Sequence, residues 1–147
     1  MVYFVVYPIV SRSLFRWQEA TAMKYISRDN AEHYTWPSAI GASLCDGWHL
    51  HRSGALSVIE ERMPPGTAEQ RHVHSHTTQF FYVLAGELTI ELDGDEHRLS
   101  LCTGLTVSAQ SPHQVFNRGS VDAHFLVISQ PPSHGDRFAV PPAQTRD

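Results

Sequence analysis

The feature that most limits the fold of this chain is a series of short apolar runs, separated by turn residues, from Ala55 onward. Glu87 to Leu92 alternates apolar and polar residues, which is the pattern of a strand with one buried face. Asp93-Gly94 follows directly and is a strong hairpin signal, because both residues tolerate positive φ. Many short antiparallel strands joined by turns are typical of a sandwich or a barrel. The sequence therefore predicts an all-β fold.

Length, charge and cysteine content limit the domain count and the partners. A chain of 147 residues is long enough for one domain with a single core. The formal net charge is −4, so composition gives no electrostatic case for nucleic acid as a partner. Cys45 and Cys102 form no disulfide framework and match no metal-binding spacing, which favours a reducing, cytoplasmic compartment.

The chain is divided into an extension at residues 1–22, a β-barrel domain at 23–135 and a tail at 136–147. Val2 to Val10 is apolar but far too short to span a membrane, and it lacks the flanks of a signal peptide, so we expect no membrane partner. Two interpretations of the extension remain. It forms an edge strand, exchanged between subunits, or it lies upstream of a protein that naturally begins at Met23.

Two histidines, two residues apart, open the region in which we expect function. On an extended segment, His72 and His74 point to the same side of the sheet. Gln79 begins the next extended run, and His113 begins a later strand. In a closed barrel these side chains could supply three nitrogens and one oxygen to a divalent metal. The set suits Fe(II), Mn(II), Ni(II), Zn(II) or Cu(II), and ligand type alone does not choose among them.

The spacing around these histidines resembles the first motif of the cupin family. That motif has a glycine, His-x-His, a glutamate and a second glycine. Gly66, His72, His74, Gln79 and Gly86 occupy these places, with glutamine in place of the glutamate. The exchange removes one negative charge, which weakens the hold on a cation and leaves a stronger Lewis acid.

The second cupin motif is present in a degraded form. His113 and Asn117 match its histidine and asparagine, whereas Ser108 and Gln110 stand in place of its proline and glycine. We expect Asn117 to hold a turn or the backbone rather than to touch a substrate. Together the two motifs cover residues 55–130 and make the chain similar to small bacterial single-domain cupins.

The resemblance implies a fold, a cofactor and an assembly. The fold would be a double-stranded β-helix, or jelly-roll barrel, following the N-terminal extension. The barrel would hold a divalent transition metal, and the assembly would be a homodimer, as in many small cupins. The implied metal ligands are His72, His74, Gln79 and His113.

Other residues are candidates for the pocket around the metal. His76 either points inward as a further ligand or lies in the connection before Gln79, and the spacing favours the connection. Glu60 shares a strand face with Arg62 and could reach the pocket mouth, or the two form a solvated pair. His76 and Glu60 are the candidates for a catalytic base. The expected pocket-lining residues, which suit an ordinary core equally well, are Phe81, Val83, Val115 and Phe125.

Three functions fit these residues. The leading one is a metal-dependent enzyme that acts on a small organic molecule by isomerase, lyase or dioxygenase chemistry. The alternative is a cupin that binds a small ligand, such as a sugar, without turnover. The third is a metal-free structural barrel that dimerises through apolar strands.

Overall fold

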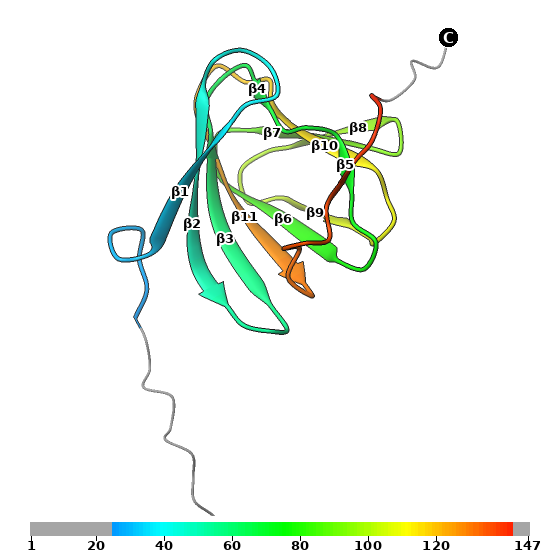
Figure 1. The fold of residues 1–147 in the computed structure, drawn as a ribbon. Helices are drawn as coiled ribbons and strands as arrows, with labels where there is room; N and C mark the ends of the chain where they lie inside the picture. The colour runs from blue at the N-terminus through cyan, green and yellow to red at the C-terminus, as the bar shows by residue number, and fades with distance from the viewer. Residues whose placement is uncertain (1–24, 143–147) are drawn as a thin grey trace, which may run out of the picture.

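The computed structural model describes residues 25–142, so the extension at residues 1–22 and the alternative start at Met23 lie outside the described residues. Two antiparallel sheets face each other and enclose the core (Figure 1). The described part of the chain contains no helix, so the prediction of an all-β, double-stranded β-helix barrel is confirmed. Consequently, no segment between residues 25 and 142 qualifies as a membrane-spanning helix.

The first sheet has the strand order β1-β2-β3-β11-β6-β9. It pairs β3 with β11 and β11 with β6, so segments far apart in sequence form the middle of the sheet. The bounds of its strands are β1 (Glu32–Pro37), β2 (Leu44–Arg52), β3 (Ser57–Met63), β6 (Thr78–Ala85), β9 (Gly104–Val107) and β11 (Ala123–Gln130).

The second sheet has the order β12-β5-β10-β7-β8, and β4 also pairs with β10. The expected hairpin at Asp93-Gly94 joins β7 to β8, and the two residues have φ values of 52° and 96°. The bounds are β4 (Thr67–Ala68), β5 (His72–Val73), β7 (Leu88–Leu92), β8 (Asp95–Leu99), β10 (His113–Asn117) and β12 (Phe138–Ala139).

The core lies between the sheets and consists of apolar side chains on alternate positions of the strands. Strand alternation explains this directly, since every second side chain of β11 points inward. The largest fully buried apolar side chains are Phe125, Met63, Leu88, Ile90 and Val83.

Residues 131–139, here named the C-terminal strap, return to the second sheet after β11. Its last two residues form β12, and Phe138 pairs with Val73 while Ala139 pairs with His72 of β5. Figure 1 shows this segment running beside β5. Residues 136–139, which the sequence assigned to a tail, thus contact the strand that carries the first histidine.

Candidate metal centre

Three buried histidines converge inside the barrel from two strands and a loop. His72 lies in β5 and pairs across the sheet with His113 of β10. His74 follows β5 by one residue. Each offers one ring nitrogen, and these atoms all lie within 4.8 Å of one another. The three residues are at most 3% exposed. This cluster could hold a metal ion.

Backbone carbonyls fix which nitrogen of each ring faces the centre. The Nδ1 atoms of His72 and His113 lie 2.8 and 3.0 Å from the carbonyl oxygens of Gln70 and Ser111. Nδ1 of His74 contacts the carbonyl oxygen of Asp136. Because a carbonyl oxygen only accepts, each Nδ1 carries the proton and each Nε2 keeps its lone pair. Metal-binding histidines have this arrangement, in which the outer nitrogen donates to a fixed acceptor.

Gln79 presents its oxygen to the same centre. Its Nε2 donates to Oγ of Ser129 at 3.2 Å, which leaves Oε1 facing inward, 3.2 Å from Nε2 of His113. With the proton of His113 on Nδ1, that pair consists of two acceptors. Nε2 of His74 is also buried and has no hydrogen-bond partner. A cation at the centre would satisfy these facing lone pairs, so the residues fit a divalent metal.

Burial keeps the imidazoles of His72 and His113 neutral. It lowers the pKa of His72 to about 3, with the charge of Arg137 adding to the effect. It lowers the pKa of His113 to about 4, with His72 nearby adding to it. Neutral imidazole is the form that binds a metal, so both rings are ready to coordinate at neutral pH.

The C-terminal strap positions His74. Strand β5 ends at Val73, so His74 lies just beyond it, and the pairs of β5 are one residue of β10 and the two of β12. The carboxylate of Asp136 instead accepts backbone N–H bonds from Ser75, His76 and Thr77, each at 2.9 Å. Although burial opposes it, these three bonds lower the pKa of Asp136 to about 2.

One cavity borders the histidines, and a second shares part of its lining. An inner one of about 110 Å³ is lined by His72, His74, Gln79 and Phe81, among others. An outer one of about 650 Å³ lies beside β1. The residues that line both are Tyr34, Glu61, Glu69 and Arg137.

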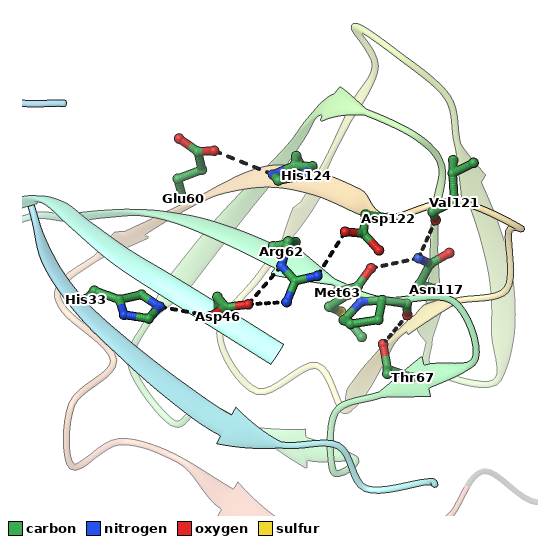
Figure 2. A network of polar contacts seen from close by, with 11 residues as sticks. His33, Asp46, Glu60, Arg62, Met63, Thr67, Asn117, Val121, Asp122 and His124 are labelled. Carbon is green, nitrogen blue, oxygen red and sulfur yellow. Dashed lines mark hydrogen bonds and ion pairs between the residues drawn. The ribbon is translucent and has the colours of Figure 1, made fainter. Parts of the chain in front are cut away.

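The structure moves Glu60 away from the pocket. Glu60 and Arg62 alternate with Glu61, which lines both cavities, so they occupy the opposite face of β3. Glu60 pairs there with Arg28 at 2.6 Å and with His124 at 3.7 Å, as Figure 2 shows for His124. The interpretation that Glu60 reaches the pocket mouth is therefore wrong. The next residue, Glu61, lines the cavities instead.

Arg62 does not form the expected pair with Glu60. Its guanidinium bridges Asp46 and Asp122, with a distance of 2.8 Å to each carboxylate (Figure 2). Asn117 holds the backbone, as expected, because its Nδ2 donates to the carbonyl oxygens of Met63 and Val121. His76 lies exposed in the connection between β5 and β6, which is the place that the sequence spacing favours.

The apolar candidates divide between cavity and core. Phe81 lines the inner cavity. Val83, Val115 and Phe125 have no exposed surface and belong to the hydrophobic core cluster. The reason is position along the strands, since Val83 is two residues beyond Phe81 on the same face of β6.

Sequence reasoning missed the polar wall that the two cavities share, which consists of Tyr34, Glu61, Glu69 and Arg137. Of the four, only Glu61 could have been found from the sequence, because it lies on the same strand face as Ile59 and Met63. The adjacent Val58 obscured that phase, since it makes the apolar pattern of the strand fit both faces. Tyr34 and Arg137 reach the wall from distant segments, which no local pattern reports.

The fold and the site define a class: a double-stranded β-helix barrel with a three-histidine cluster inside. A family model described as "Cupin domain" matches residues 59–129. The chain belongs to the cupin superfamily. Membership of this superfamily accounts for both the histidine spacing and the sheet topology.

The chain is similar in sequence to proteins with different named functions. The chain is 30% identical over 95 residues to the tetracenomycin polyketide synthase protein TcmJ of Streptomyces glaucescens, covering 65% of this chain and 56% of that protein. It is 30% identical over 105 residues to quercetin 2,3-dioxygenase of Bacillus subtilis, covering 66% of this chain but 30% of that enzyme. The chain thus spans about half or less of these two relatives.

A solved structure shares the fold. The sugar phosphate isomerase from a cupin superfamily of Silicibacter pomeroyi superposes with a TM-score of 0.61 at 22% identity, covering 73% of this chain and 75% of that one. At this identity the likeness concerns the fold alone.

Proposed function

We propose that this chain is a metal-dependent cupin enzyme that acts on a small organic molecule. The ligands would be His72, His74, Gln79 and His113. The observation that carries the proposal is the contact of each histidine Nδ1 with a backbone carbonyl oxygen, to which Nδ1–H donates, so that three Nε2 lone pairs and Oε1 of Gln79 face one centre. When bound, the metal would supply Lewis acidity toward a substrate oxygen and, if redox-active, oxygen chemistry.

The protein residues contribute binding and proton transfer. The outer cavity is large enough for a small molecule, and the residues of the polar wall line both this cavity and the inner one beside the histidines. A carboxyl group in such a wall supports isomerase or lyase chemistry, which needs an acid and a base. The similarity to quercetin 2,3-dioxygenase supports dioxygenase chemistry over the matched region. Binding of a sugar-like ligand without turnover is the alternative.

The metal site is tested by elemental analysis of protein reconstituted separately with each candidate metal. Wild-type protein should bind one ion per chain, and His74→Ala should lose most of that binding because it removes a ligand. His76→Ala is the matched control, since His76 is exposed two residues away. Absence of stoichiometric metal in the reconstituted wild type would contradict the proposal.

Gln79→Glu should tighten metal binding, because a carboxylate replaces a neutral oxygen at the same distance from the centre. Competition titration with a chelating dye measures the change in affinity. Ser129→Ala provides a comparison, since it frees the Gln79 amide without adding charge. Equal or weaker affinity in Gln79→Glu would show that residue 79 is not a ligand.

A further inference from the structure

Glu61 is one of the four residues that the two cavities have in common. It lines both of them and is only 8% exposed. Glu69 and Arg137 line both as well, and they form an ion pair with each other at 3.8 Å. Among residues 25–142, no cation lies within ion-pair distance of Glu61, whereas Glu91 is paired with Arg71. Glu61 is therefore a buried carboxyl group that faces a cavity without a neutralising partner.

Tyr34 reaches Glu61 across a glycine. Tyr34 of β1 pairs with Gly47 of β2, and Gly47 pairs with Glu61 of β3, so the three form one row across the sheet. A Cβ at Gly47 would lie 2.2 Å from Cζ of Tyr34, which shows that the ring covers the space above the glycine. The Tyr34 hydroxyl then donates to Oε1 of Glu61 at 3.0 Å. The missing side chain at residue 47 permits this contact.

The surroundings of Glu61 suit proton transfer near neutral pH. Burial, together with the charge of Glu69, raises its pKa to about 8, and the Tyr34 hydrogen bond and Arg137 oppose the rise. A group with a pKa near the working pH exchanges protons in both directions, which is the requirement for a general acid and base. The titratable and charged groups near Glu61 are Tyr34 from β1, Cys45 from β2, Glu69 from the β4–β5 connection and Arg137 from the C-terminal strap, and His72 and His74 line the same inner cavity.

The charges of the wall restrict the substrate. The outer cavity contains Glu61, Glu69 and a single cation, Arg137, which is already paired with Glu69. This arrangement leaves no unpaired cation for a phosphate group. A neutral polar molecule, with hydroxyl and carbonyl groups for the hydrogen-bonding side chains, fits the wall better than an anion does.

We propose that Glu61, held by Tyr34 across Gly47, is the catalytic base and acid of this site, acting on a neutral hydroxycarbonyl compound. The carboxylate of Glu61 takes a proton from the carbon next to the carbonyl group. The electrons of that C–H bond form a carbon–carbon double bond, and the carbonyl electrons move to oxygen to give an enolate. The Glu61 carboxyl group then returns the proton to carbon. This role rests on the proposed function, since the metal centre must activate the carbonyl group.

The test is hydrogen–deuterium exchange at carbon in 1,3-dihydroxyacetone, followed by proton NMR in D₂O with the metal-reconstituted full chain. Wild type should accelerate the exchange, and Glu61→Gln should slow it by about 100-fold or more, the usual scale of general base catalysis. Glu60→Gln is the matched control, because it removes a neighbouring carboxylate on the opposite face of β3. Metal content is measured in every variant. Dihydroxyacetone phosphate should exchange more slowly than the neutral probe.

The pH profile of exchange in Tyr34→Phe separates an effect on Glu61 from a purely structural effect of Tyr34. Because the hydrogen bond from Tyr34 lowers the pKa of Glu61, its loss should shift the pH profile of exchange to higher pH. An unshifted profile would overturn the role of Tyr34. Two results would overturn the role of Glu61 while leaving the metal site in place. In one, metal-loaded wild type exchanges dihydroxyacetone no faster than buffer does; in the other, Glu61→Gln exchanges it as fast as wild type. Faster exchange of the phosphorylated probe overturns the neutral substrate, and failure to bind metal overturns both proposals.

Discussion

Replacing Phe125 with alanine should lower the free energy of unfolding by about 3–5 kcal/mol, the range for removing a buried phenylalanine ring. Phe125 has no exposed surface and packs beside Phe81, with ring centroids 6.3 Å apart. The cavity left behind would lie in the core between the two sheets. Chemical denaturation monitored by tryptophan fluorescence measures the loss.

Phe80→Ala is the control for that experiment. Phe80 lies in the adjacent strand β6 and is 37% exposed, so its removal should cost far less. A loss below about 0.5 kcal/mol for Phe125→Ala would contradict the core assignment, since that is the usual scale of surface substitutions. Such a result would instead favour the expectation that Phe125 lines the pocket. The pair of variants therefore separates core from cavity.

Glu61→Gln should remove a strong pH dependence from the stability of the protein. Burial raises the pKa of Glu61 in the folded state from 4.5 to about 8. Between these values the unfolded chain has released the proton while the folded chain keeps it, so rising pH favours unfolding. The contribution of Glu61 to stability is thus fully present below pH 4.5 and is lost as the pH rises through about 8. The slope is about 1.4 kcal/mol per pH unit at most.

Urea unfolding of the metal-free protein at pH 6 and at pH 8.5 measures this effect. Wild type should lose stability between the two, and Glu61→Gln should lose less, so the variant gains relative to wild type at the higher pH. Glu60→Gln should follow wild type, because Glu60 pairs with Arg28 on the outer face of β3. Parallel pH dependence in wild type and Glu61→Gln would show that Glu61 titrates normally. This measurement needs no substrate, so it checks the environment of Glu61 separately from catalysis.

The outcome for β3 shows where sequence reasoning lost accuracy. Val58 and Ile59 are both apolar, so the strand fits two phases, and the sequence does not decide whether Glu60 or Glu61 faces inward. Pairing with β2 and β11 settles the phase, because β3 lies between them in the sheet. A shift by one residue moves every side chain of a strand to the other face. For that reason the proposed catalytic residue of β3 is Glu61 and not Glu60.

The sequence by itself determined the all-β class and the hairpin at Asp93-Gly94, and its motif spacing picked out His72, His74, Gln79 and His113 as candidate ligands. These depend on local alternation, turn chemistry and motif spacing, which are encoded within short stretches of the chain. Only the tertiary structure decided the orientation of the rings by backbone carbonyls and the fastening of His74 by Asp136. It also placed Tyr34 over Gly47 beside Glu61. Each of these joins segments remote in sequence, and their contact depends on how the two sheets and the C-terminal strap pack.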